Sequence, residues 1–252
     1  MSAPAVLPPV CILAGGIGSR LGEQVETIPK PLVEVAGEPF LMHQLRLLAH
    51  YQARDVVMCV GYLGEAIEGV IGPERFGIRI TYSYDGPGLD GTLGAIHRAA
   101  GHLGPSFLVL YGDTYLRIDY GAAFEAWRRS GQPAMMAVLR NEGRWDVSNA
   151  VLDGTSVIAY DKRTPSPNMR WIDYGLGGLT HAALELLGED ASDLADLYHA
   201  LAVRHELFGF EAVDRFYEIG TPAALQETDA FLRSLIAGEA SERAPISDEP
   251  FG

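Results

Sequence analysis

The chain has 252 residues, 48% of them hydrophobic, which is enough for one large domain. Its 33 acidic residues outnumber 19 Lys and Arg, and the resulting net charge of −14 argues against nucleic acid or an anionic membrane surface as a partner. Two cysteines, no signal-peptide pattern and no apolar run of about 18 residues favour reduced thiols, a cytoplasmic protein and no membrane span.

Strand and helix patterns alternate over the first half of the chain. The predicted strands are 10–13, 55–60, 78–83, 107–111 and 134–139, and the predicted helices are 41–53, 64–70, 92–103 and 122–130. Such alternation is typical of a mainly parallel sheet. We therefore expect an α/β fold, a single Rossmann-like domain with an open sheet and helices on both faces.

The second half of the chain predicts a different mixture of elements. Residues 147–180 are rich in short strands and turns, and we expect them to form a small β-rich extension of the sheet. Helices are predicted over 192–204, with Ser192 as N-cap, and over 221–236, with Pro222 in the first turn. We expect a flexible N-terminus over 1–8, the domain over 9–236 and a disordered tail over 237–252.

A glycine-rich turn follows the first predicted strand. It reads L-A-G-G-I-G-S-R-L from Leu13 to Leu21, and P-K-P-L follows at residues 29–32. Backbone N–H groups after a strand can hold phosphates, while Arg20 and Lys30 add positive charge. The turn is neither a Walker A loop nor a full dinucleotide fingerprint, because Leu21 stands where the third glycine belongs. It indicates a nucleotide-phosphate site, with an ordinary tight turn as the alternative.

A carboxylate follows the predicted strand 107–111. In open α/β sheets, ligands bind outside the carboxyl ends of the strands, which is where Asp113 is expected. Mg²⁺ prefers one or two carboxylates together with substrate phosphates. Asp113 is therefore a candidate Mg²⁺ ligand, although aspartates also begin ordinary turns.

These motifs together resemble those of the sugar-1-phosphate nucleotidyltransferases. That family carries L-A-G-G-x-G-x-R-L, P-K-P-L and V-x-G-x-P, the last present here at residues 35–39. Further matches are G-T-L-G-A at 91–95, G-D at 112–113, D-K at 161–162 and E-I-G-T-P at 218–222. The resemblance is to short members that act on heptose, mannose or N-acetylmuramate 1-phosphates.

The resemblance implies transfer of a nucleoside monophosphate from an NTP to a sugar 1-phosphate, with Mg²⁺ as cofactor. The implied catalytic residues are Arg20, Lys30 and Lys162, and the implied metal ligands are Asp113 and Glu218. The implied nucleotide-binding residues are Leu13, Ala14, Gly15, Gly16, Gly18, Ser19, Tyr84, Gly91 and Thr92, and the implied sugar-binding residues are Asn149, Asp161, Asp173 and Gly175.

The chain departs from the family pattern mainly on the acceptor side. Asp161 replaces Glu, Asn149 stands where Gly is usual, and Asp173 begins a D-Y-G where many relatives have N-x-G. Glu218 also replaces the usual Asp of D-I-G-T-P. These departures suggest an unusual sugar, a heptose or a hexose. The short length resembles the single-domain guanylyl- and uridylyltransferases, and of these two bases guanine is the one that we expect.

Other functions fit parts of the pattern. A cytidylyltransferase acting on phosphocholine or another non-sugar phosphate would need an aromatic cage, for which Tyr84, Trp145, Trp171 and Tyr174 are the candidates. An inactive nucleotide-binding regulatory subunit and a Rossmann oxidoreductase are further alternatives. The charged segment 140–146 is either a lid or a solvated turn, and a homo-oligomer stays open.

Overall fold

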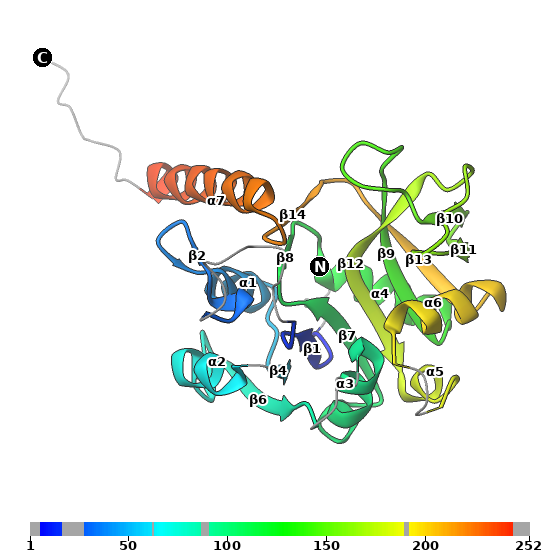
Figure 1. Ribbon diagram of the computed structural model, residues 1–252, viewed down its shortest axis with the longest axis horizontal. Helices are drawn as coiled ribbons and strands as arrows, with labels where there is room; N and C mark the ends of the chain where they lie inside the picture. The colour runs from blue at the N-terminus through cyan, green and yellow to red at the C-terminus, as the bar shows by residue number, and fades with distance from the viewer. Residues whose placement is uncertain (1–5, 17–27, 62, 87–90, 189–191, 244–252) are drawn as a thin grey trace, which may run out of the picture.

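The computed structural model describes residues 6–16, 28–61, 63–86, 91–188 and 192–243. Its centre is a ten-stranded mixed sheet with the order β10-β11-β13-β9-β12-β7-β1-β4-β6-β5 (Figure 1). The strands are β1 (Val10–Leu13), β4 (Asp55–Val60), β5 (Glu74–Arg75), β6 (Ile78–Tyr84), β7 (Ser106–Tyr111), β9 (Ala134–Arg140), β10 (Ala150–Asp153), β11 (Ser156–Tyr160), β12 (Trp171–Thr180) and β13 (Leu207–Ala212).

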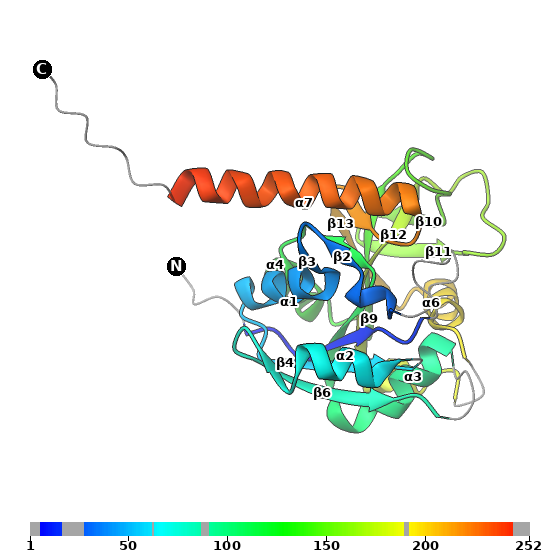
Figure 2. The ribbon, with the colours of Figure 1, turned by 60° about the vertical axis from the view of Figure 1, so that its left-hand side comes forward.

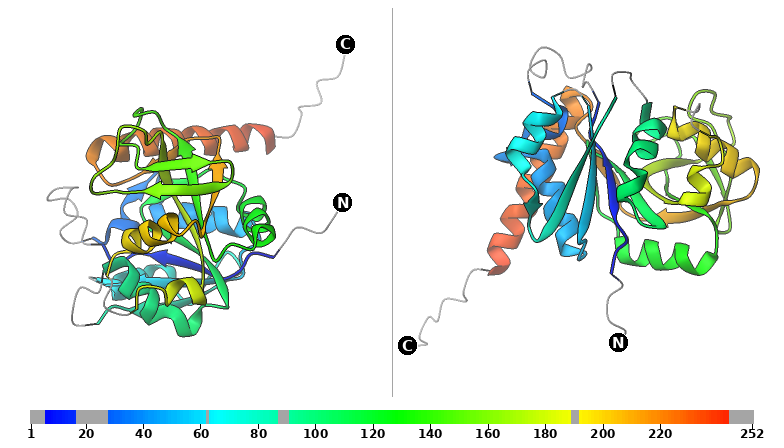
Figure 3. Two further views of the ribbon diagram at one scale, coloured as in Figure 1. Left: turned by 90° about the vertical axis from the view of Figure 1, so that its right-hand side faces the viewer. Right: turned by 90° about the horizontal axis from the view of Figure 1, so that it is seen from below.

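Helices cover both faces of this sheet, as the sequence predicts (Figure 3). Strand residues alternate between the two faces, and Val10 and Ile12 pack in one core while Cys11 packs in the other. The first face carries α1 (Phe40–His50), α2 (Gly64–Ile71) and α4 (Tyr120–Ser130). The second carries α3 (Gly91–Ala99), α5 (His181–Leu184) and α6 (Leu194–Val203).

The expectation of an open, mainly parallel sheet is only partly correct. Strands β7, β1, β4 and β6 are mutually parallel. Beyond β7 the pairing becomes mixed, because β12 runs antiparallel to both β7 and β9. Strand β10 pairs with β11 on one side and with β12 on the other, so β10, β11, β13, β9 and β12 close into a ring. The expected β-rich extension is thus a closed element.

Short elements complete the frame around the site. A 3-10 helix, Lys30–Leu32, precedes the two-stranded β2 (Glu34–Val35) and β3 (Glu38–Pro39), and a second 3-10 helix, Ala100–His102, follows α3. Strand β14 (Phe216–Glu218) pairs antiparallel with β8 (Thr114–Leu116). Helix α7 (Pro222–Arg243) then runs beside α1 and β2, and it extends beyond the predicted end at residue 236 (Figure 2).

The cap of α6 differs from the prediction. Asp193, and not Ser192, is the N-cap, because its carboxylate accepts a hydrogen bond from Ala195 N at 2.9 Å. The predicted helix 192–204 is correspondingly Leu194–Val203. Among the described residues, no helix is long and apolar enough to cross a membrane.

Candidate active site

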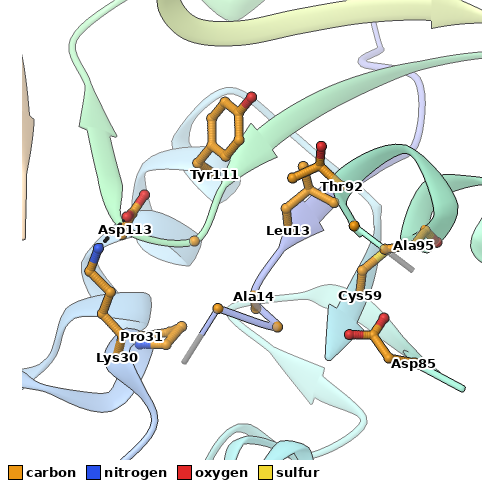
Figure 4. Close-up of a pocket in the computed structure, with 14 residues that line it drawn as sticks. Leu13, Ala14, Lys30, Pro31, Cys59, Asp85, Thr92, Ala95, Tyr111 and Asp113 are labelled. Atoms are coloured by element: carbon orange, nitrogen blue, oxygen red, sulfur yellow. Dashed lines mark hydrogen bonds and ion pairs between the residues drawn. The ribbon is translucent and has the colours of Figure 1, made fainter. Parts of the chain in front are cut away.

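A pocket of about 260 Å³ opens at the carboxyl ends of the parallel strands β1, β4, β6 and β7 (Figure 4). This is the position at which open α/β sheets bind ligands. It is lined by Leu13, Ala14, Gly15, Gly16, Lys30, Pro31, Cys59, Asp85, Gly91, Thr92, Ala95, Tyr111, Gly112 and Asp113. The structure therefore brings the first part of the glycine turn together with Lys30, Asp113 and the start of α3.

Lys30 and Asp113 form an ion pair at this pocket. Lys30 is held by the 3-10 helix between two prolines and is only 9% exposed. The Asp113 carboxylate accepts a second hydrogen bond, from Thr114 Oγ1 at 3.1 Å. Both charged groups therefore have a fixed direction, which is the kind of preorganisation that phosphate chemistry needs.

Glu218 reaches the same place from β14. Its register partner is Thr114, and the next residue, Ile219, donates its N–H to Asp113 O at 3.0 Å. The Glu218 carboxylate accepts the N–H of Gly220, and a Cβ added at Gly220 would lie 3.3 Å from Lys30 Nζ. The two acids predicted as metal ligands are therefore neighbours, although Glu218 is not part of the pocket lining.

The donor set suits Mg²⁺ bound with its substrate. Two carboxylates with phosphate oxygens and water are the usual ligands of Mg²⁺, whereas dedicated all-protein cages are unusual for it. Within the described ranges, no group of three or more His, Cys, Asp or Glu side chains could hold a metal without a substrate. Asp113 and Glu218 are thus two neighbouring carboxylates whose chemistry fits a divalent metal bound together with phosphate oxygens.

The glycine turn lies directly against the neighbouring strand ends. Ala14 N donates to Cys59 O at 2.8 Å, and a Cβ at Gly15 would lie 2.8 Å from Asp85 Oδ2 and 3.2 Å from Gly61 N. A larger residue than glycine would therefore displace this packing. At Gly16 the added Cβ would meet no atom of the described residues within 4 Å. Gly18, Ser19 and Arg20 lie outside the described residues.

At the end of β6, Asp85 lines the pocket, whereas Tyr84 does not. The Tyr84 hydroxyl donates to Glu68 of α2, and this hydrogen bond raises the pKa of Tyr84 to about 12. Tyr84 is absent from the lining, whereas the Asp85 carboxylate points toward the glycine turn (Figure 4). The alternation of side chains along a strand is the sequence signal that separates these two residues.

Thr92 joins the beginnings of α3 and α6. Its Oγ1 accepts the N–H of Leu194 at 2.8 Å and donates to Asp193 Oδ1 at 3.3 Å. Gly91 has a φ of +69°, and a Cβ there would overlap the carbonyl of Ser192. These two lining residues thus connect the pocket to the helix that covers the ring of strands.

Lys162 and Asp173 both lie near Tyr111. Lys162 Nζ is 5.8 Å from the centre of the Tyr111 ring, which itself lines the pocket. The Asp173 carboxylate accepts from Gly175 N at 2.9 Å and from the Tyr160 hydroxyl at 3.3 Å. Burial raises the pKa of Asp173, against the opposing effects of the Gly175 N–H, Lys162 and the Tyr160 hydroxyl.

Asn149 joins the segments that carry Asp161 and Asp173. It is 7% exposed, its Oδ1 accepts from Asp173 N at 2.9 Å, and its carbonyl accepts from Asp161 N at 3.0 Å. The Asp161 carboxylate is used by its own turn, because it accepts the N–H groups of Thr164 and Arg163, each at 2.8 Å. These bonds lower the pKa of Asp161, with the Thr164 N–H first.

The segment 140–146 is a tightly bonded turn. Asn141 is fully buried, and its Nδ2 donates to Asp146 O at 2.6 Å and to Ser148 Oγ at 3.0 Å. Trp145 is 38% exposed. The guanidinium carbons of Arg144 and Arg215 lie 5.1 and 5.6 Å from the centre of its ring. Its side chain does not line the pocket described above.

Several lining residues have no distinctive sequence motif. Cys59 and Tyr111 are members of apolar strands. Their role follows only from the order of the strands, which places the ends of β4 and β7 on either side of β1. Cys59 and Cys11 are free thiols with their sulfurs 3.5 Å apart.

Comparison with known proteins gives a family match over residues 10–225, to the MobA-like NTP transferase domain. The mannose-1-phosphate guanyltransferase of Yarrowia lipolytica is 28% identical over 256 residues, covering 95% of this chain and 68% of that protein. The N-acetylmuramate alpha-1-phosphate uridylyltransferase of Neisseria meningitidis serogroup B is 38% identical over 116 residues, covering 45% of this chain and 50% of that protein. The chain thus spans only part of the length of these relatives.

Solved structures share the fold. HddC from Yersinia pseudotuberculosis, complexed with GMP-PN, has a TM-score of 0.72 at 22% identity and covers 90% of this chain and 100% of its own. A putative glucose-1-phosphate thymidylyltransferase from Bacillus anthracis, in complex with a sucrose, has a TM-score of 0.79 at 20% identity and covers 97% of each chain.

Proposed function

The chain belongs to the family of MobA-like NTP transferase domains, and from this premise we propose that it transfers a nucleoside monophosphate from an NTP to a sugar 1-phosphate, releasing pyrophosphate. The observation that carries the proposal is the Lys30–Asp113 ion pair beside the glycine turn, at the carboxyl ends of the parallel strands. The two relatives compared above, a mannose-1-phosphate guanyltransferase and an N-acetylmuramate alpha-1-phosphate uridylyltransferase, are both named for sugar 1-phosphate substrates, which supports the proposal.

The proposed reaction is an in-line displacement at the α-phosphorus of the NTP. The sugar phosphate oxygen is already ionised at neutral pH, so the attack needs no general base. The protein must hold two anions together and stabilise the charge that develops at phosphorus. In this proposal Lys30 and Lys162 neutralise the α-phosphate and the incoming phosphate. Arg20 and the turn N–H groups hold the leaving pyrophosphate.

Asp113 and Glu218 are the residues that would hold Mg²⁺ in this reaction. A bound Mg²⁺ would orient the triphosphate and withdraw charge from the oxygens around the α-phosphorus. Lys30 is paired with the Asp113 carboxylate, so it fixes the direction of that group before the substrate arrives.

Guanine is the base that the pocket favours. Asp85 is the acidic side chain at the end of β6 in the lining, and an ionised carboxylate only accepts hydrogen bonds. Guanine offers two adjacent donors, N1–H and the N2 amino group, to such an acceptor. The solved structure of HddC is a complex with GMP-PN, and the relative from Yarrowia lipolytica is a guanyltransferase.

The acceptor is proposed to be a heptose or hexose 1-phosphate. Lys162 would contact its phosphate, while Asn149, Asp161, Asp173 and Gly175 would form the sugar side. The carboxylate of Asp173 supports this arrangement, because Lys162 and the Tyr111 wall of the pocket lie close to it. The Asp161 carboxylate would have to break hydrogen bonds within its own turn to reach a sugar hydroxyl.

The alternatives have less support. A choline cage would need its aromatic rings around one space, but Tyr84 is bonded to Glu68, Trp145 packs on arginines, and Tyr174 is buried against Phe216. None of these three lines the pocket. An inactive regulatory subunit has no need for the paired Lys30 and Asp113. We also propose a cytoplasmic location.

Pyrophosphate release tests the proposal. The assay would cross the four NTPs with hexose, aminohexose and heptose 1-phosphates and with phosphocholine. We expect release with GTP and at least one sugar 1-phosphate, and none from the matched Asp113→Asn protein. Release only with CTP and phosphocholine would establish the cytidylyltransferase instead, and no release from a folded, GTP-binding protein would support a regulatory subunit.

A further inference from the structure

A buried glutamine on α1 contacts the turn that carries Asp113. Gln44 is 1% exposed, and its Nε2 lies 2.8 Å from Tyr111 O and 2.9 Å from Thr114 O. Both partners are carbonyl oxygens, so the amide nitrogen must be the group that faces them. Because these carbonyls stand on either side of Gly112 and Asp113, one side chain bridges the whole turn.

The other bonds to this turn come from different directions. Gly112 N donates to Leu13 O at 2.9 Å, which ties the turn to the start of the glycine loop. Ile219 N donates to Asp113 O at 3.0 Å, which ties it to β14. Among the described residues, Gln44 is the side chain on α1 that bonds to both ends of the turn.

Packing alone does not account for an amide at this position. Its neighbours on the buried face of α1, Leu41, Leu45 and Leu48, are apolar and fully buried. The Oε1 atom of Gln44 is buried with no hydrogen-bond partner among the described residues, which is unfavourable for folding. A methionine or leucine would fill the space without that penalty. What the glutamine adds in return is the pair of amide N–H groups that bond to the turn.

We propose that Gln44 is a positioning residue for Asp113. It fixes the 111–114 turn so that the Asp113 carboxylate meets Lys30 and a triphosphate-bound metal together. The inference rests on the proposed function, because that function gives Asp113 its role. Gln44 touches neither substrate nor metal, so its loss should change turnover and the Mg²⁺ requirement more than the KM for the sugar phosphate.

Two variants and one control test this role. Gln44→Met keeps the length of the side chain but removes both donors, and Gln44→Asn keeps the amide but shortens its reach. Tyr82→Phe is the control, since it removes one side-chain bond to a carbonyl, at 2.8 Å from Gly72 O, away from the pocket. Hydrogen–deuterium exchange of the substrate-free proteins is measured first, over peptides that span residues 106–116.

We expect faster exchange in these peptides for Gln44→Met and no change for Tyr82→Phe. In the assay, Gln44→Met should lower kcat by about 10- to 100-fold and raise the half-saturating Mg²⁺ concentration, the usual scale for residues that orient metal ligands. If Gln44→Met does not fold, Gln44→Asn decides by the same measurements.

Two results separate this inference from the function on which it rests. Unchanged exchange, or faster exchange with unchanged kcat and Mg²⁺ requirement, would overturn the positioning role. Faster exchange in a chain whose wild type releases no pyrophosphate from any substrate pair would overturn the proposed function, while the contact between Gln44 and the turn would stand.

Discussion

Lys30 and Asp113 form an ion pair although they are 83 residues apart in the sequence. Lys30 comes from a short 3-10 helix after the glycine turn, and Asp113 lies two residues beyond the end of β7, which pairs with β1. The pair therefore joins the two halves of the candidate phosphate site. Each partner is fixed before any substrate binds, which reduces the reorganisation required in the reaction.

Loss of the cation should reduce turnover without unfolding the chain. We expect Lys30→Met to lower kcat by about 10²- to 10³-fold, the scale for removing one preorganised stabilising group. Pyrophosphate release at saturating substrates is the measurement, with thermal unfolding as the check on folding. Arg128→Met, which breaks only the exposed pair with Glu125 on α4, is the control and should keep wild-type turnover. A Lys30→Met protein with normal turnover would contradict the assignment.

The charge of Glu218 should matter more than its length. Mg²⁺ accepts carboxylates from either Asp or Glu, so Glu218→Asp should keep turnover within about tenfold, whereas Glu218→Gln should lose about 10- to 100-fold in activity or metal affinity. The Mg²⁺ dependence of pyrophosphate release measures both. Glu227→Gln, at an exposed residue of α7 paired with Arg215, is the matched control. Equal activity in all three variants would remove Glu218 from the metal site.

Local patterns predict the strands and helices of the phosphate side well. The apolar runs at β1, β4 and β7 and the glycine turn are consecutive features, and they place Lys30 and Asp113 at one edge of the sheet before the structure is known. The family match also agrees with the motif-based prediction.

The closed ring of strands is the part of the fold that the sequence does not predict, because it depends on pairings between strands far apart in the chain. Closure of the ring depends on β13, which enters between β9 and β11 after α6, and no local pattern encodes that partner choice. The pairing of β12 with β9 shifts register between Asp173 and Gly177, where Gly175 has a φ of +95°. On one side of this shift residues 176–180 pair with β7, and on the other side Trp171 pairs with β10. The positions of Asp85 at the pocket and of Gln44 at the 111–114 turn are not predicted for a similar reason, because the residues that they contact belong to other elements.

Asp85 should determine the choice of base. Removing the charge from a hydrogen bond of this kind costs about 1.5–3 kcal/mol, so Asp85→Asn should lose about 10- to 100-fold in kcat/KM for GTP. The same variant should lose less with UTP or CTP, which lack the adjacent pair of donors. The ratio of kcat/KM values for the nucleotides is the readout. Asp153→Asn, at an exposed residue of β10, is the control. An unchanged ratio would mean that another group reads the base.

Asp173 and Asp161 should affect the pH dependence of stability in opposite directions. Burial raises the pKa of Asp173 above its ordinary value of 3.8, so its proton is held to higher pH in the folded chain than in the unfolded chain. Its contribution to the free energy of unfolding is therefore fully present below the unfolded pKa and is lost as the pH rises through the folded pKa. Asp173→Asn, which stays neutral, should gain in Tm relative to the wild type over that rise.

Asp161 supplies the opposite sign in the same segment of the chain. The N–H groups of Thr164 and Arg163 lower its pKa from 3.8, so its contribution is present above the unfolded pKa and is lost as the pH falls through the folded pKa. Asp161→Asn should therefore lose Tm relative to the wild type at neutral pH. Scanning Tm from acid to neutral pH checks both variants against the wild type. Tm differences of the same sign at neutral pH would show that burial does not dominate at Asp173.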